Sequence, residues 1–245
     1  MSELQTCFRR YEKKYLLTKA QYLAVRLGMA AYMKPDAHPR YSITNIYYDT
    51  EHYDLIRASL GKPVYKEKLR LRSYGTPNDD STVFLELKKK FGGVVYKRRE
   101  AMPLHEALTY LSGGPAPRDT QIMHELDYAM QFYNQPAPAM FIAYERDAWF
   151  VRDDEQIRIT FDSNARYRAT GLDLRAGSGG TALLPEGTVI LEVKTIGAMP
   201  LWLADALCDC HILPGSFSKY GAAYERTQRH AITMTQGEYD HVSNF

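Results

Sequence analysis

Lys66-Glu67-Lys68-Leu69-Arg70-Leu71-Arg72 is the stretch of sequence that decides the fold. Successive side chains of a β-strand point to opposite faces, so a strand here places four cations on one face and two leucines on the other. In one strand alone, such a charged face is ordinarily the solvated side of a sheet. The interpretation therefore depends on whether other strands repeat the pattern.

The same alternation recurs in six further segments of the chain. The charged or polar residues that share one face are Arg10, Glu12 and Lys14; Glu86 and Lys88; Lys97 and Arg99; Tyr144 and Arg146; Arg158, Thr160 and Asp162; Glu192 and Lys194. Faces so rich in cations would repel one another across neighbouring strands unless an anion lay between them. We therefore expect the sheet to curl until these faces line a lumen that binds a polyanion, such as a phosphate chain.

Helices are available to cover the apolar faces of this sheet. Thr18 is a candidate N-cap for a helix over 19–32, and Pro35 and Pro39 predict its end before a strand at 42–49. Other helices are expected at 50–60, 103–112, 119–134, 200–207 and 219–229, and other strands at 8–17, 64–74, 82–90, 93–102, 139–151, 156–169 and 188–195. The Gly-rich segment 171–187 predicts a mobile loop.

Composition bounds the class of protein. With 245 residues, 45% hydrophobic and 24% charged, the chain is globular, and we expect one domain over 1–232 and a tail over 233–245. The absence of a long apolar run, of a signal peptide and of a cysteine framework predicts a cytoplasmic protein. The net charge of +2 indicates no partner by itself. Placing the inner-face charges in the lumen leaves a net negative exterior, which disfavours nucleic acid as a partner.

Three carboxylates stand among the cations in a repeated Glu-x-Lys pattern. They are Glu12, Glu86 and Glu192, each with a lysine two residues later on the same face. A few carboxylates among many cations suit a divalent ion that bridges protein and phosphate oxygens. All three are therefore candidate metal ligands. The run from Cys208 to His211 lacks the second pair of ligands that a structural zinc site needs.

Several short motifs, matched in order over about residues 5–228, resemble the VTC domain, the polyphosphate polymerase branch of the triphosphate tunnel metalloenzymes. They are Arg10-Tyr11-Glu12, Tyr47-Tyr48-Asp49-Thr50, Lys68-Leu69-Arg70-Leu71-Arg72, Glu86-Leu87-Lys88, Lys97-Arg98-Arg99, Tyr144-Glu145-Arg146, Arg158-Ile159-Thr160-Phe161-Asp162, Leu191-Glu192-Val193-Lys194 and Phe217-Ser218-Lys219-Tyr220. The resemblance implies an α+β fold with a closed antiparallel barrel of about eight strands, a tunnel flanked by helices. It also implies a metal-dependent phosphotransferase that moves the γ-phosphate of ATP onto inorganic polyphosphate with Mn²⁺ or Mg²⁺.

The resemblance also implies roles for individual residues. The implied catalytic phosphate contacts are Lys14, Arg70, Arg72, Lys88, Lys97, Arg146, Arg158 and Lys219, the polar contacts are Tyr144 and Ser218, and the metal ligand is Glu192. Arg10, Arg99 and Lys194 share the same strand faces and are added as substrate-binding candidates. Any membrane partner for polymer export would be a separate protein.

Two departures and two alternatives accompany this hypothesis. Hydrolytic relatives resemble one another in a first-strand Glu-x-Glu-x-Lys, and Arg10 here replaces the first carboxylate, which favours phosphate over water as the acceptor. Ser216 stands where some relatives have a lysine before the Phe-Ser-Lys run. The alternatives are a triphosphate hydrolase that uses the same residues and a non-catalytic binder of polyphosphate or inositol phosphates. Single-stranded nucleic acid is disfavoured because the tyrosines do not interleave with the cationic faces.

Overall fold

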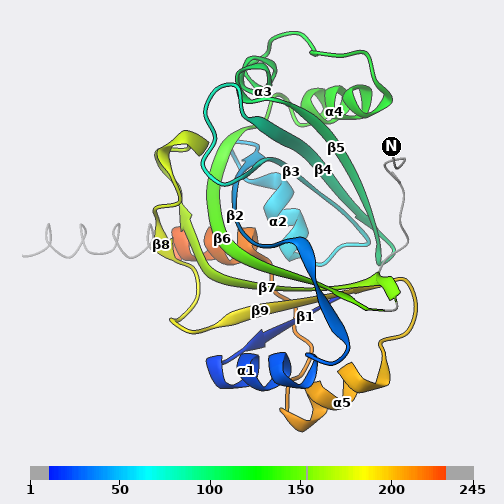
Figure 1. Cartoon of the computed structure of the whole chain (residues 1–245). Coiled ribbons are helices and arrows are strands. Elements are labelled where there is room, and N and C mark those ends of the chain that lie inside the picture. Colours follow the sequence, from blue (N-terminus) through cyan, green and yellow to red (C-terminus); the bar gives the residue numbers. More distant parts are fainter. Residues whose placement is uncertain (1–10, 153, 230–245) are drawn as a thin grey trace, which may run out of the picture.

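The structure, a computed structural model, describes residues 11–152 and 154–229. Its centre is one antiparallel sheet in the strand order β1-β9-β7-β6-β2-β3-β4-β5, with β8 paired to β7. The strands are β1 Tyr11–Leu17, β2 Met33–Asp49, β3 Tyr65–Tyr74, β4 Thr82–Phe91, β5 Val94–Pro103, β6 Ala137–Val151, β7 Asp154–Arg168, β8 Thr181–Ala182 and β9 Val189–Thr195. The sheet curls round, and we call its concave inner side, where the side chains of the inner face meet, the lumen (Figure 1).

Helices pack against both faces of the curled sheet, so the expected α+β fold is confirmed. They are α1 Lys19–Gly28, α2 Asp54–Leu60, α3 Leu104–Leu111, α4 Gln121–Phe132 and α5 Leu201–Asp209, with a further helix over 219–229. Leu69 and Leu71 of β3 are 1% and 0% exposed and lie in a core cluster with residues of α3 and α4, as their alternation predicts. A second cluster joins α1 and α5 to β1, β7 and β9.

The helix over 219–229 packs against the inner side of the sheet. Its Tyr220 and Ala223 share a buried cluster with Met140 and Ile142, which lie on the same face of β6 as Tyr144. The Tyr220 hydroxyl donates to Asp49 Oδ2 at 2.8 Å, so the C-terminal helix is fastened to the end of β2. This helix therefore fills part of the lumen and brings Ser218 and Lys219 next to the inner strands.

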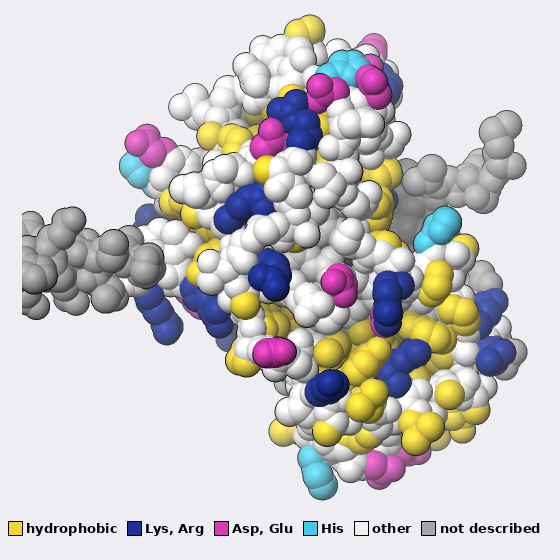
Figure 2. Space-filling view, turned by 60° about the vertical axis from the view of Figure 1, so that its left-hand side comes forward, with side chains coloured by type: hydrophobic (Ala, Val, Ile, Leu, Met, Phe, Trp, Pro, Cys, Tyr) yellow, Lys and Arg dark blue, Asp and Glu magenta, His cyan; other side chains and the backbone are white. Residues whose placement is uncertain are grey.

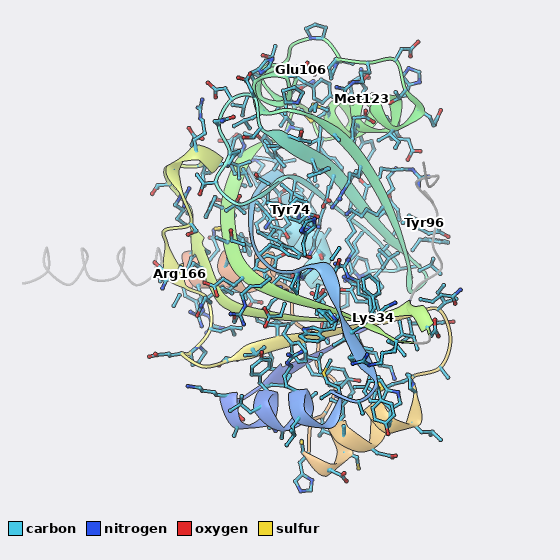
Figure 3. All side chains as sticks on the ribbon, in the orientation of Figure 1. Lys34, Tyr74, Tyr96, Glu106, Met123 and Arg166 are labelled. Carbon is cyan, nitrogen blue, oxygen red and sulfur yellow. The ribbon has the colours of Figure 1, made fainter. Side chains whose placement is uncertain are left out.

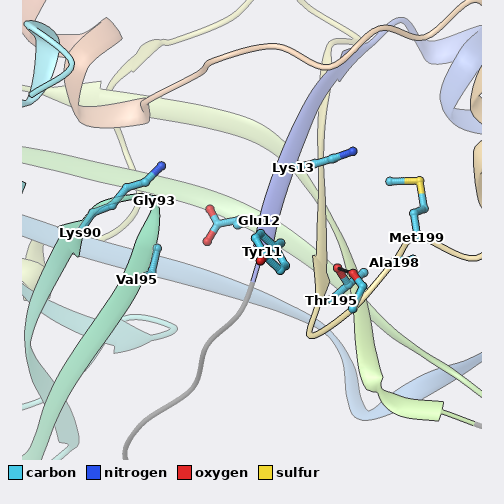
Figure 4. A pocket seen from close by; sticks show the side chains of 10 residues that line it. Tyr11, Glu12, Lys13, Lys90, Gly93, Val95, Thr195, Ala198 and Met199 are labelled. Carbon is cyan, nitrogen blue, oxygen red and sulfur yellow. Dashed lines mark hydrogen bonds between the residues drawn. The ribbon is translucent and has the colours of Figure 1, made fainter. Parts of the chain in front are cut away.

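The two edge strands of the sheet, β1 and β5, are not paired to each other among the described residues. The expected closure into a barrel is therefore not made by backbone hydrogen bonds here. A side-chain contact between β4 and β1 spans the gap, with Lys88 Nζ 3.3 Å from Glu12 Oε2. A cavity of about 400 Å³ lies at this seam, and Figure 4 shows the Glu12 carboxylate pointing towards the β4–β5 hairpin while Lys13 turns the other way.

The prediction that Pro35 and Pro39 end a helix and precede the strand was wrong. The helix ends earlier, at Gly28, and β2 begins at Met33, so both prolines lie within the strand. Over this first part β2 pairs only with β6, and the register shifts between Pro35 and Arg40. A strand with one free side and a bulge tolerates proline, because the missing N–H has no partner to lose.

The segment 171–187 is organised around one arginine. Arg168 donates to the carbonyl oxygens of Gly171, Asp173, Gly177 and Gly179 at 2.7–3.1 Å. The segment also contains the 3₁₀ turn Leu174–Ala176 and the strand β8. A loop at this place was expected, and these contacts give it a defined path.

The outer surface near α1 and α5 is rich in apolar side chains. Leu23 and Leu27 of α1 and Leu201 of α5 are 57%, 81% and 80% exposed, and Figure 2 shows apolar groups gathered at this end of the molecule, with lysine and arginine among them. Within residues 11–152 and 154–229, no helix is both long and apolar enough to span a membrane.

Candidate active site in the lumen

Most of the predicted site residues within the described part of the chain form two clusters, and each cluster contains both cations and carboxylates. The Glu192 cluster comprises Glu12, Lys14, Arg146, Asp162, Glu192, Lys194 and Lys219. The Glu86 cluster comprises Arg70, Arg72, Glu86, Lys97 and Arg99. Arg10, a predicted substrate contact, lies outside the described residues.

Glu192 lies among four cations from four elements. Its carboxylate is 3.3 Å from Lys14 Nζ on β1, 3.4 Å from Arg146 Nη2 on β6, and 3.5 Å from Lys194 Nζ on its own strand. Lys219, at the start of the C-terminal helix, is 3.9 Å away. Burial alone would raise the pKa of Glu192, but the surrounding cations hold it well below its ordinary value. The group is therefore an anion at any physiological pH.

Asp162 fixes the direction of Arg146. The arginine Nε and Nη2 donate to the two Asp162 oxygens at 2.6 and 2.7 Å, a bidentate pair, and Lys219 Nζ contacts Oδ2. Asp162 is 1% exposed, and burial is outweighed by Arg146 and Lys219, which lower its pKa. The alternation in the sequence predicts Asp162 on the inner face but no role for it. In the structure it orients two candidate phosphate contacts, Arg146 and Lys219.

Glu12 and Glu192 share one ammonium group. Lys14 Nζ lies 3.3 Å from an oxygen of each carboxylate. Lys88 and Lys14 outweigh the effect of burial and hold the pKa of Glu12 at about 2, so both carboxylates are ionised. Two of the three predicted metal ligands are thus brought together.

Glu86 is the buried centre of the second cluster. It is 0% exposed, and its oxygens contact Arg70 Nη2 at 2.7 Å, Lys97 Nζ at 2.6 Å, Arg99 Nε at 2.7 Å and Arg72 Nε at 3.7 Å. These cations lower its pKa well below the ordinary value against the opposing effect of burial. The third predicted metal ligand is therefore engaged by four cations.

Tyrosine side chains connect the clusters. Arg70 Nη1 donates to the Tyr47 hydroxyl at 3.0 Å, and Arg72 Nη2 donates to the Tyr144 hydroxyl at 3.3 Å. Lys219 Nζ lies 4.2 Å from the centre of the Tyr144 ring, a cation–π contact that also reaches the Glu192 cluster. Tyr47 belongs to a motif that implied no role for it, and its place on the inner face follows from the alternation of the strand at 42–49.

Lys68, one of the four cations that share a face of β3, also belongs to the site. Its Nζ donates to Ser218 Oγ at 2.8 Å. Burial is the largest cause that lowers the pKa of Lys68, and with the nearby Lys14 and Lys88 it brings the value to about 7. Lys68 therefore gains charge readily when an anion arrives.

Two buried polar atoms on β7 lack a hydrogen-bond partner among the described residues. They are Arg158 Nε and Thr160 Oγ1, two positions apart on the inner face. The Arg158 Nη2 is engaged, at 2.8 Å from Asp36 Oδ2 and 3.2 Å from the Tyr41 hydroxyl. Unpaired buried polar atoms are costly, so their presence on the lumen side indicates a place for ligand atoms.

The donor set fits a divalent ion only with help from the substrate. The described residues contain no group of three His, Cys, Asp or Glu side chains placed to hold a metal. The two neighbouring carboxylates, Glu12 and Glu192, are hard oxygen ligands, and Mg²⁺ is often bound by one or two carboxylates together with phosphate oxygens and water. The two carboxylates would hold such an ion only if further ligands, such as phosphate oxygens and water, completed its coordination.

The fold and the site together define a class of protein, one in which a curled antiparallel sheet gathers lysines and arginines around a few buried carboxylates. The chain belongs to the VTC domain family, because the model of that domain matches residues 9–228. Subunit 2 of the vacuolar transporter chaperone complex of Saccharomyces cerevisiae is 27% identical over 147 residues, which are 50% of this chain and 18% of that protein. The chain thus spans less than a fifth of that relative.

A solved structure supports the fold. A candidate adenylate cyclase from Bacillus halodurans superposes with a TM-score of 0.53 at 13% identity, over 86% of this chain and 96% of that one. A candidate adenylyl cyclase from Hippeastrum, described as having a dominant triphosphatase activity, gives 0.49 at 16% identity, over 86% and 93%. At 13% identity, the likeness to the Bacillus halodurans structure concerns the fold alone.

Proposed function

We propose that the protein is a polyphosphate polymerase that transfers the γ-phosphate of ATP to the end of a polyphosphate chain in the lumen. Membership of the VTC domain family supports this function. The observation that carries it is the excess of cations over carboxylates along the lumen, with the cations aimed inward from both walls. A chain of phosphates is the ligand that such a lumen fits best.

The geometry suits transfer without a covalent protein intermediate. Phosphoryl transfer depends mainly on alignment of the reacting oxygens and on neutralisation of charge. Arg70 and Arg146, held by Glu86 and Asp162 respectively, present oriented guanidinium groups from two walls of the lumen. The acceptor, a terminal phosphate, is already ionised at neutral pH and needs no strong general base.

Glu192, with Glu12 beside it, would hold the Mn²⁺ or Mg²⁺ ion. The ion would supply neutralisation of the charge on the phosphate oxygens. Without the ion, Lys14 lies between the two carboxylates and balances their charge. With the ion bound, Lys14 would contact phosphate oxygens instead.

A hydrolase is the second candidate, because Glu12 remains as a carboxylate that could orient water. The same lumen would then release phosphate from a triphosphate. The two activities differ in the acceptor, so the products of ATP turnover distinguish them.

The yeast relative is a subunit of a complex whose name includes transport. We therefore propose that a polymer made in the lumen is passed to a separate membrane partner. Binding of the purified protein to a membrane fraction, with and without bound polymer, tests this step.

Substitution of Glu192 tests whether the lumen is catalytic or only binds phosphate. Glu192→Gln should reduce ATP turnover at least about tenfold, because the charge-assisted contacts of a metal ligand are lost. Binding of tripolyphosphate should persist, since the cations remain. Glu186→Gln, on the exposed loop before β9, is the matched control. Absence of turnover by the unsubstituted protein, with intact tripolyphosphate binding, would favour a binding module.

A further inference from the structure

One end of the lumen is lined by aromatic side chains. Tyr74, the last residue of β3, contacts Tyr41 of β2 and Phe84 of β4 edge to face, with ring centroids 5.4 and 5.5 Å apart. Tyr74 is 45% exposed, so part of its ring remains free. In the view of Figure 3, the Tyr74 side chain lies within the outline of the curled sheet. We call these three residues the aromatic mouth.

Arginines predicted to bind phosphate hold the aromatic mouth in place. Arg99 donates from Nη2 to the Tyr74 hydroxyl at 3.3 Å and from Nε to Glu86 at 2.7 Å. Arg158 donates from Nη2 to the Tyr41 hydroxyl at 3.2 Å. The Arg99 guanidinium also lies 4.5 Å from the centre of the Phe84 ring. The aromatic mouth thus directly contacts two of the arginines of the lumen.

The other end of the same two strands has a different character. There β3 and β4 pair Lys66 with Lys90 and Lys68 with Lys88, so lysines face one another across the strands. A bare phosphate chain is attracted by lysines, but it has no flat surface that could stack on an aromatic ring. A nucleoside triphosphate has both a flat base and a chain of phosphates, and each part matches one chemistry of this lumen.

We propose that Tyr41, Tyr74 and Phe84 form a subsite for the purine base of the phosphate donor. The triphosphate then extends inward past Arg99 and Arg158. This assignment rests on the proposed function, since it presumes a nucleotide donor. It also gives the lumen a direction: the nucleotide enters at the aromatic mouth, and the lysine end is left to the phosphate chain.

The test compares a ligand with a base and a ligand without one. Binding of the methylene-bridged ATP analogue, which is not cleaved between the β- and γ-phosphates, and of inorganic tripolyphosphate is measured by calorimetry with Mg²⁺. Tyr74→Leu should weaken binding of the ATP analogue about fivefold or more, because base stacking is lost. Its affinity for tripolyphosphate should stay within about twofold, since the cations remain. Tyr74→Phe, which keeps the ring and loses the hydroxyl, should bind both ligands as the unsubstituted protein does.

Tyr128→Leu is the matched control, because Tyr128 is an exposed aromatic residue of α4, on the outer face of the sheet. Equal weakening of both ligands by Tyr74→Leu would overturn the subsite, since Tyr74 would then act only through Arg99. Unchanged binding of both ligands would overturn it as well. Failure of the unsubstituted protein to bind tripolyphosphate would instead count against the proposed function, so the two failures are distinguishable.

Discussion

Lys68 and Ser218 are joined by a hydrogen bond of 2.8 Å although 150 positions separate them in the chain. Ser218 Oγ also accepts the backbone N–H of Gly221 at 3.0 Å, so it caps the C-terminal helix. The bond therefore ties β3 to the start of that helix. It places a lysine whose pKa is lowered to about 7, by burial and by Lys14 and Lys88, inside the lumen.

Binding of a polyanion should be accompanied by proton uptake. At pH 8 most Lys68 side chains are neutral, and a bound phosphate chain raises their pKa because it favours the charged form. Affinity for tripolyphosphate should therefore fall as the pH rises from about 7 to 9. Calorimetry in buffers with different ionisation enthalpies measures the uptake, and Lys68→Met should reduce it. An uptake that is unchanged in Lys68→Met would show that other groups take the proton.

Arg70→Ala should lower ATP turnover at least about tenfold while the fold persists, because a charge-assisted contact to phosphate is worth about 1.5–3 kcal/mol. The fold should survive because Glu86 keeps Arg72, Lys97 and Arg99 as partners. Steady-state rates and the melting temperature are the measurements. Lys13→Ala, on the outward face of β1, is the control. Activity of Arg70→Ala within about twofold of the unsubstituted protein would remove Arg70 from the site.

Glu86→Gln should destabilise the protein by about 3–5 kcal/mol, because it leaves four cations around a buried position without their carboxylate. Added tripolyphosphate should restore more of the melting temperature in this variant than in the unsubstituted protein, since it supplies negative charge. Thermal unfolding with increasing tripolyphosphate measures both effects. If the main defect were instead a raised Mn²⁺ requirement at normal stability, Glu86 would be a metal ligand, as the sequence analysis proposed.

Removal of divalent ions should abolish turnover and leave binding of phosphate chains measurable. The arrangement of cations around Glu192 needs no ion. It is formed by Lys14, Arg146, Lys194 and Lys219, which remain available to phosphate after the ion is removed. Turnover is measured after dialysis against EDTA and again after addition of Mn²⁺ or Mg²⁺. Undiminished product formation in EDTA would end the metal hypothesis.

The alternation of charged and apolar residues predicted the inner and outer faces of the strands correctly, because period-two spacing is a local property. It did not predict how the edges meet. Closure depends on the curvature of the whole sheet, and β1 and β5 are brought near each other by elements far apart in sequence. The effect of Pro35 and Pro39 could not be predicted locally, because a strand tolerates proline only where no neighbouring strand needs the missing N–H group.

Most of the candidate site was predicted from residue type and order, but its internal connections were not. The pair Arg146–Asp162 joins two strands at matched register, which the sequence cannot supply. The contact of Lys68 with Ser218 depends on where the C-terminal helix enters the lumen. Sequence patterns thus identified the charged side chains, and long-range packing decided which of them share a carboxylate.

The central claim is that the lumen joins phosphates into a chain. The most direct measurement incubates the protein with ATP labelled in the γ-phosphate and with Mn²⁺, and separates the products by gel electrophoresis and acid precipitation. We expect an acid-insoluble ladder of labelled polyphosphate, absent in Glu192→Gln. Label found only as free phosphate, with no phosphate chain longer than the triphosphate of ATP, would contradict the account and favour hydrolysis.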